Sequence, residues 1–181
     1  MSKGLFVFRR DLRVQDNRGL AELCEECTEV YCVFCLDPRQ ITAKNKYFSA
    51  TAMLFMLDSL IELGKEINMR VVYGKPVEEI VKLVTSNKIN VVGFNEDYTP
   101  YARERDESIR KKLKTIGVDC RMYEDVALNS PNAIKEYKVF TPYYLQASKI
   151  KVKELKKPKI SVVRKLTCKT VDLEKLRDRK S

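Results

Sequence analysis

Five short hydrophobic segments alternate with four amphipathic helical patterns, and this alternation limits the fold more than any other feature of the chain. Most of the five segments are almost continuously apolar, which is typical of strands that are covered on both faces. The predicted strands are residues 5–8, 29–36, 70–73, 89–94 and 119–123. The predicted helices between them are residues 17–27, 49–66, 76–87 and 101–116.

A regular exchange of strands and helices predicts an α/β fold, here a Rossmann-like five-stranded parallel sheet with helices on both faces. We expect the strand order 3-2-1-4-5, in which the first and fourth strands are neighbours. Binding sites in such sheets lie beyond the carboxyl ends of the strands, near the point where the strand order reverses. The polar segments after the first and fourth strands should therefore face each other across one crevice.

Local signals mark several helix ends. Asp16 and Asn17 are the expected caps of the first helix, Pro76 opens the third, and Gly117 follows the fourth as a C-cap. In the helix over 49–66 the apolar spacing predicts one stripe, made of Ala52, Phe55, Met56, Ser59, Leu60 and Leu63.

Several kinds of chemistry are excluded by what the sequence lacks. The chain has no histidine, so no catalytic mechanism that uses an imidazole is available. Its six glycines form neither a dinucleotide fingerprint nor a P-loop. The pairs Cys24/Cys27 and Cys32/Cys35 have the spacing of zinc ligands, but residues three apart in a strand point to opposite faces. We therefore expect small buried side chains there and no metal site.

The C-terminal segment differs from the rest in charge. Residues 151–181 carry 12 Lys and Arg against 4 Asp and Glu, whereas the whole chain carries 35 against 25. We expect a folded domain over 1–148 and a basic linker or tail over 149–181. Such a tail favours a polyanion through counterion release, or it is simply solvated. No apolar run is long enough to cross a membrane, and the expected compartment is the cytoplasm, or the nucleus in a eukaryotic host.

Five segments in register resemble the N-terminal domain of the DNA photolyase and cryptochrome family. They are "FVFRRDLRVQDNRGL" (6–20), "VFCLDP" (33–38), "FMLDSLIELG" (55–64), "GFNEDYTPYARERDESI" (93–109) and "YKVFTPYY" (137–144). Each segment alone is a weak signal, but five in the correct order are specific. The sequence departs from the family at Ala52, which falls near an arginine common at the start of that helix.

This resemblance implies that the crevice holds an antenna chromophore, which is a folate, a deazaflavin or a flavin such as FMN. The antenna would pass excitation to FAD, which in the family is bound by a larger helical domain that also binds the DNA lesion. The excited reduced FAD splits a pyrimidine dimer by electron donation. The implied partner is such a helical domain, in cis or in trans, with DNA reached only through it. We expect no catalytic residue and no catalysis in this chain alone.

The candidate chromophore contacts follow three of the predicted strands. They are Arg9 and Arg10 after the first strand, Asp37 after the second, and Asn95, Glu96, Asp97 and Tyr98 after the fourth. An arginine can pair with an acidic group of a chromophore, and an asparagine can hydrogen-bond the edge of a pterin or flavin. Each also has a structural alternative: the arginines can bridge nearby aspartates, and the tyrosine can pack under the crossover.

Two other functions remain open at this stage. The first is a stand-alone nucleotide- or flavin-binding module of the same architecture, which would need no helical partner. The second is a non-catalytic remnant, which would bind no ligand and would expose a sticky surface around Tyr143 and Tyr144.

Overall fold

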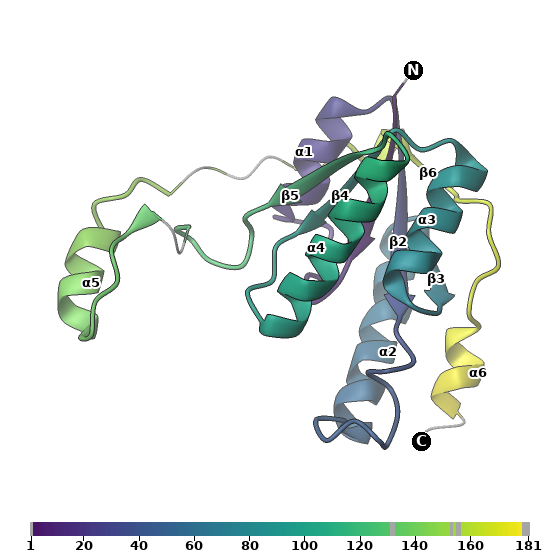
Figure 1. Ribbon diagram of the computed structural model, residues 1–181, viewed down its shortest axis with the longest axis horizontal. Helices are drawn as coiled ribbons and strands as arrows, with labels where there is room; N and C mark the ends of the chain where they lie inside the picture. The colour runs from purple at the N-terminus through teal and green to yellow at the C-terminus, as the bar shows by residue number, and fades with distance from the viewer. Residues whose placement is uncertain (1, 131–132, 153, 155–156, 179–181) are drawn as a thin grey trace.

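The structure, a computed structural model, describes residues 2–130, 133–152, 154 and 157–178. Its parallel sheet has the strand order β3-β2-β1-β4-β5, which confirms the predicted fold (Figure 1). The strands are β1 (Lys3–Phe8), β2 (Glu29–Leu36), β3 (Met69–Tyr73), β4 (Val91–Asn95) and β5 (Asp119–Tyr123).

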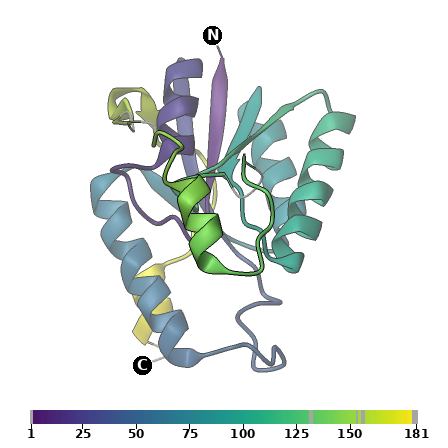
Figure 2. The same cartoon turned by 90° about the vertical axis from the view of Figure 1, so that its left-hand side faces the viewer.

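Helices cover both faces of the sheet. The helices α1 (Arg18–Glu26) and α2 (Ala50–Glu66) lie on one face, and α3 (Pro76–Asn87) and α4 (Pro100–Thr115) lie on the other (Figure 2). No helix in the described part of the chain is both long and apolar enough to cross a bilayer.

The central strand β1 connects the two halves of the core. Phe6 and Phe8 pack on the side of α1 and α2, whereas Leu5 and Val7 pack on the side of α3 and α4. Successive side chains of a strand point to opposite faces, so a continuous apolar run is what a doubly covered strand requires. The end of this buried strand is thereby fixed, and it positions the charged residues that follow.

Two local expectations are confirmed only in part. The N-cap of α1 is Asn17, whose side-chain oxygen accepts from the amide of Leu20 at 3.1 Å. Asp16 instead turns the chain with a φ of 54°, a left-handed conformation that aspartate tolerates better than most residues. The buried stripe of α2 is Met53, Leu57, Leu60 and Leu63, and Phe55 is exposed. Because residues 53–57 are all apolar, periodicity alone could not choose the phase of this helix.

The C-terminal segment folds back on the sheet domain. A short 3-10 turn (Ile160–Val162) leads into β6 (Val163–Arg164), which pairs with the start of β2. That part of β2 is free because pairing with β3 begins only at Cys32. The helix α6 (Leu173–Asp178) then packs against α2. The boundary at residue 148 stays a prediction, but the described part of the expected linker includes a sixth strand.

The helix α5 (Phe140–Ala147) lies apart from the sheet and buries none of its residues (Figure 1). The apolar spacing over 127–149 is irregular, so the sequence does not predict this helix. Several large apolar side chains on and beside α5 are exposed: Val139, Phe140, Tyr143, Tyr144 and Leu145. An unpartnered surface of this kind is typical of an interface.

Candidate functional site

Two pockets open at the carboxyl ends of the strands. The polar pocket, of about 390 Å³, is lined mainly by charged residues after β1, β4 and β5, including Arg13, Asp11, Asn95, Glu96 and Asp125. The apolar pocket, of about 240 Å³, lies over β1 and β2 and is lined by Phe8, Phe34, Met56, Ile80, Tyr101, Arg105 and Ile109 among others. Arg9, Arg10 and Asp97 line both pockets. The crevice is therefore where the strand order predicted it.

Arg9 is buried directly after β1. Its guanidinium lies 3.8 Å above the centre of the Phe94 ring, and its Nη1 donates to Asp106 at 2.6 Å and to the carbonyl of Asn95 at 3.3 Å. Burial lowers the pKa of Arg9 to about 10, and the positive charge of Arg105 acts in the same direction. Arg9 stays protonated at neutral pH, so a full positive charge lies beneath the crevice.

Asp106 is shared by two arginines. Its Oδ2 accepts from Arg9, and its Oδ1 accepts from Nε of Arg105 at 2.9 Å. One carboxylate therefore faces two guanidinium groups. The Nη2 atoms of Arg9 and Arg105 are buried and have no hydrogen-bond partner among the residues that the structure describes. Buried charged donors without an acceptor are unfavourable, so these two guanidinium groups are the least satisfied polar groups of the crevice.

The polar pocket is held by a network centred on Asn95. Its amide nitrogen donates to Asp11 at 2.6 Å, to Asn17 at 3.0 Å and to Asp125 at 3.2 Å. The network depends on Gly19, since a Cβ at that position would lie 2.2 Å from Oδ1 of Asn95. The amide nitrogen of Asn95 is thus occupied by protein acceptors, and the network joins the end of β4 to the start of α1.

Arg13, which follows Arg9 and Arg10 in the loop after β1, bridges two aspartates. It donates to Asp16 at 2.6 Å and to Asp125 at 2.7 Å. Asp125 also accepts from the backbone amide of Arg18 at 3.1 Å. These contacts link the loop after β1 to the loop after β5, and they pair the charges of the polar pocket with one another.

Asp97 and Arg10 stand between the two pockets. Asp97 accepts from the backbone amide of Thr99 at 3.0 Å and lies 3.4 Å from Nε of Arg10. Burial alone would raise the pKa of Asp97, but the hydrogen bonds from Thr99 and the charge of Arg10 outweigh it and lower the pKa. The Arg10 side chain is 78% exposed, so it can turn toward either pocket. Glu96 lines only the polar pocket of the two, and Tyr98 lines neither.

Asp37 is buried, and it holds the side chains of Arg39 and Tyr101 in place. It accepts from the hydroxyl of Tyr101 at 2.5 Å and from Arg39 at 2.6 Å. Burial would raise the pKa of Asp37, but the hydrogen bonds from Arg39 and Tyr101 lower it overall. Asp37 lines neither the polar nor the apolar pocket, and instead it fixes Tyr101, which lines the apolar pocket.

Sequence reasoning missed the importance of Arg105. The many charged residues of the predicted helix over 101–116 favour a solvated helix face, so they do not single out Arg105. Tyr101, Arg105 and Ile109 follow one another at intervals of four residues on α4, so they share a face. An isoleucine in so charged a helix is expected to point inward, so the spacing from Ile109 is the signal that could have placed Arg105 at the crevice.

Comparison with known proteins gives a consistent picture. The family model for DNA photolyase matches residues 5–159. The deoxyribodipyrimidine photo-lyase of a Synechococcus species is 31% identical, over 77% of this chain and 31% of that protein.

Two solved structures share the architecture. An archaeal photolyase from Sulfolobus tokodaii, solved with two FAD molecules and implying a novel light-harvesting cofactor, is 36% identical with a TM-score of 0.86. The alignment covers 99% of this chain and 42% of that one. A Synechocystis cryptochrome is 17% identical with a TM-score of 0.81 over 94% of this chain and 38% of its own, a likeness of fold alone. The chain spans less than half the length of these relatives.

Proposed function

The chain belongs to the DNA photolyase family, and we propose that it is the light-harvesting domain of a photolyase-like protein. Its apolar pocket holds an antenna chromophore, which is a flavin, a deazaflavin or a folate. When bound, that chromophore absorbs light and transfers excitation energy to FAD. The residues of this chain orient the chromophore and exclude water from it.

One observation carries this proposal: Arg9 and Arg105 line a pocket whose walls are largely Val7, Phe8, Phe34, Met56, Ile80 and Ile109, and their Nη2 atoms have no hydrogen-bond partner among the described residues. Flavin, deazaflavin and pterin rings are flat, and each carries ring oxygen and nitrogen acceptors on one edge. Such an edge would satisfy both guanidinium groups, while Phe34 and Met56 would contact the ring faces. The two FAD molecules of the Sulfolobus relative favour a flavin among these chromophores.

The proposed partner is a helical FAD-binding domain, either in the same polypeptide or in another chain. The relatives are more than twice as long as this chain, and α5 exposes apolar side chains without a partner within the described residues. Contact with DNA, and light-driven repair of pyrimidine dimers, would be made through that domain. The polar pocket then has a structural role, because the charged side chains that line it form ion pairs with one another.

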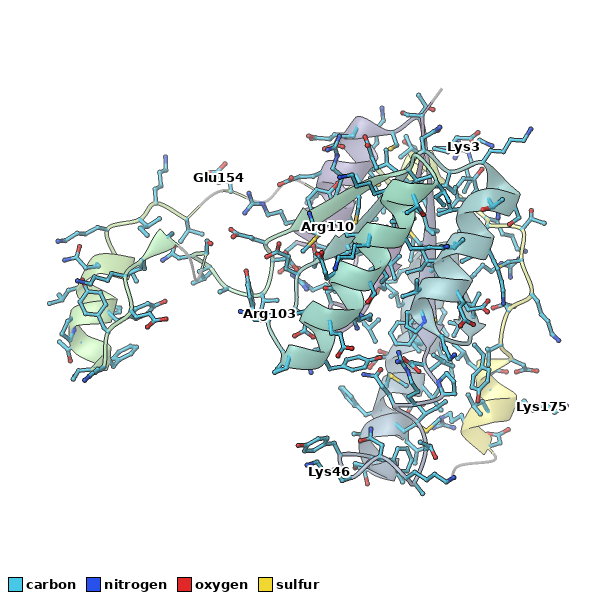
Figure 3. All side chains as sticks on the ribbon, in the orientation of Figure 1. Lys3, Lys46, Arg103, Arg110, Glu154 and Lys175 are labelled. Atoms are coloured by element: carbon cyan, nitrogen blue, oxygen red, sulfur yellow. The ribbon has the colours of Figure 1, made fainter. Side chains whose placement is uncertain are left out.

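A binding titration tests the proposal. The purified chain is titrated with FMN, FAD, a deazaflavin and a reduced folate, and chromophore fluorescence is followed. We expect one of them to bind with a dissociation constant in the micromolar range or below, and Arg105→Met to weaken it about tenfold. Arg110→Met is the matched control, because Arg110 lies on the outer side of α4 and its ion-pair partner among the described residues is Glu107 (Figure 3).

The outcomes separate the three functions. Binding, followed by energy transfer to FAD in a helical partner, supports the antenna domain. Binding without any helical partner in a co-purification from the native source supports a stand-alone module. Failure of all four chromophores to bind would contradict the antenna proposal and leave a non-catalytic remnant of the fold.

A further inference from the structure

The C-terminal segment carries a run of basic residues that the proposed function does not use. Residues 157–169 contain no acidic residue, and their five basic side chains are all exposed. These five, here called the basic ridge, are Lys157, Lys159, Arg164, Lys165 and Lys169. Because the chain before residue 151 is close to balanced in charge, most of the formal net charge of +10 lies in this C-terminal segment.

The ridge is fixed against the sheet domain and is not a loose tail. Two of the residues between its members, Val163 and Leu166, are buried. Val163 belongs to β6 and pairs with Val30 of β2. The Nε of Arg70 on β3 donates to the carbonyl of Leu166 at 3.1 Å. The apolar side chains of this segment therefore anchor it, while its basic side chains point into solvent.

A second anchor follows the ridge directly. The hydroxyl oxygen of Thr170 accepts from the backbone amide of Val71 at 3.1 Å, and the amide of Val171 donates to the carbonyl of Val71 at 2.7 Å. Both contacts satisfy backbone groups of β3, the last strand on this side of the sheet. The backbone of the ridge is thus held at two places, so a ligand that binds it has little chain entropy to remove.

The lysines of the ridge have no charged partner in the part of the chain that the structure describes. Lys157, Lys159, Lys165 and Lys169 form no ion pair there. Carboxylates close to the segment are paired elsewhere. Glu29, next to Val30, pairs with Lys3. Glu79, whose charge acts on Cys168, pairs with Lys82. The positive charge of the ridge is therefore not neutralised within the domain.

The other exposed groups of this segment indicate the kind of partner. Ser161 and Thr167 are exposed, and the one large apolar side chain exposed within 157–169 is Ile160, at 39%. A protein interface generally has an apolar centre with few charges, and the ridge offers none. Lysine, arginine, serine and threonine side chains are those that contact the phosphates of a nucleic acid. A regular array of phosphates therefore fits this surface better than an acidic protein does.

The ridge lies on the opposite side of the sheet from α5. It follows β6 and the edge of β3, whereas α5 comes after β5 at the other edge (Figures 1 and 2). The exposed apolar side chains of α5 are where the helical partner was proposed to dock. A nucleic acid on the ridge would consequently be bound away from that partner.

From this arrangement we propose that the basic ridge binds the phosphate backbone of duplex DNA without regard to sequence. The contact is additional to the lesion contact assigned to the helical partner, and it lies on this chain itself. The ridge carries no aromatic side chain and no helix that would enter a groove, so it does not read bases. The inference needs no chromophore, so it stands or falls independently of the antenna proposal.

The test measures binding of the full chain to a short fluorescent duplex that contains no lesion. Fluorescence anisotropy is followed over a range of salt concentrations. The ridge variant combines Lys157→Gln, Lys159→Gln, Lys165→Gln and Lys169→Gln. The matched control combines Lys44→Gln, Lys46→Gln, Lys112→Gln and Lys114→Gln, which are exposed, form no ion pair within the described residues and change the net charge equally. Urea denaturation verifies that both variants fold as the unmodified chain does.

We expect the logarithm of the association constant of the unmodified chain to fall with the logarithm of salt concentration with a slope of about −4, because each phosphate contact releases about one counterion. The ridge variant keeps only Arg164, so its slope should be about −1. Its affinity at low salt should be more than about tenfold lower. The control variant should keep the slope and lose less than about threefold in affinity.

Three outcomes would overturn the proposal. Equal losses of affinity in the ridge variant and the control would show that only the net charge of the chain matters. A salt slope flatter than about −1 in the unmodified chain would exclude the counterion release that the ridge requires. Displacement of the duplex by polyglutamate as effective as by unlabelled duplex, at equal charge concentration, would favour an acidic protein as the partner.

Discussion

The two pockets at the carboxyl edge of the sheet differ in how their polar groups are satisfied. In the polar pocket, the carboxylates of Asp125 and Asp11 accept hydrogen bonds from Arg13 and Asn95, and the one unpartnered atom of this network among the described residues is the neutral Oδ1 of Asn95. In the apolar pocket, Arg9 and Arg105 share the one carboxylate of Asp106 and keep two nitrogens unpartnered among the described residues.

This difference gives the two pockets different roles. The network of Asp11, Arg13, Asn17, Asn95 and Asp125, here called the brace, stabilises the fold, whereas the apolar pocket is the candidate binding site. A network whose members satisfy one another stabilises the fold and gains little from a ligand. A pocket with buried charged donors and apolar walls gains from one, because the ligand supplies the missing acceptors. The larger pocket with more charges is therefore the less promising ligand site, although most of the candidate residues line it.

The largest effect on stability is expected at Gly19, which packs against Asn95 of the brace. In Gly19→Ala the new Cβ would lie 2.2 Å from Asn95 and 2.8 Å from Tyr123, so the network must shift. We expect a loss of about 3 kcal/mol in the free energy of unfolding, measured by urea denaturation. Gly64→Ala is the control, because nothing lies within 4 Å of its Cβ. It should stabilise the protein slightly, and similar effects of the two substitutions would contradict the close approach.

Substitution of Arg13 tests the brace without the added side-chain volume of Gly19→Ala. Arg13→Met leaves the buried carboxylate of Asp125 without its charged partner, and we expect a loss of about 2 kcal/mol in stability. Chromophore affinity should stay unchanged, in contrast to Arg105→Met. Lys82→Met removes an exposed pair with Glu79 and should change stability by less than about 0.5 kcal/mol. A large loss of affinity in Arg13→Met would show that the polar pocket takes part in binding.

The pH dependence of stability tests the role of Asp37, which holds Tyr101 in the wall of the apolar pocket. Its pKa in the folded protein lies below the ordinary value of 3.8, so its contribution is present above that pH and is lost as pH falls through the folded pKa. Asp37→Asn should therefore lower stability by about 1 kcal/mol at neutral pH. Urea denaturation at neutral pH and at a pH below 3.8 would check that the difference from the unmodified chain shrinks as the pH falls. A difference that is the same at both values would contradict the role of the carboxylate.

The smallest stability effect is expected at Arg10, which both pockets share. Its pair with Asp97 is mostly exposed, so Arg10→Ala should change the free energy of unfolding by less than about 0.5 kcal/mol. Thermal unfolding would check this. A loss of stability as large as that of Arg13→Met would make Arg10 part of the brace. It would then contradict the different roles assigned to the two pockets.

Much of the fold could be predicted because its signals are local. The strand over 29–36 and the helix over 76–87 have the predicted bounds, since continuous apolar runs and an opening proline act within a few residues. The phase of α2 could not be predicted, because residues 53–57 offer apolar side chains in every direction. Its orientation was decided by packing against the sheet and α6.

The candidate site was predicted in position and only partly in detail. Arg9, Arg10 and Asp97 do lie at the crevice, because parallel strands end at a common edge. Tyr98 lies outside both pockets, and Asp37 reaches the apolar pocket only through Tyr101. The directions of these side chains depend on loop conformations, which leave no periodic signal in a sequence.

The sequence by itself therefore determined the layered sheet, the strand order and the edge where a site can form, since hydrophobic period and short connections leave few arrangements. Only the tertiary structure decided which charges remain unpaired. Arg9 meets Asp106 across 97 positions of the chain, and Val163 pairs with Val30 although a basic tail was expected there. Contacts between such distant residues depend on how packed elements meet in space, and no local pattern encodes them.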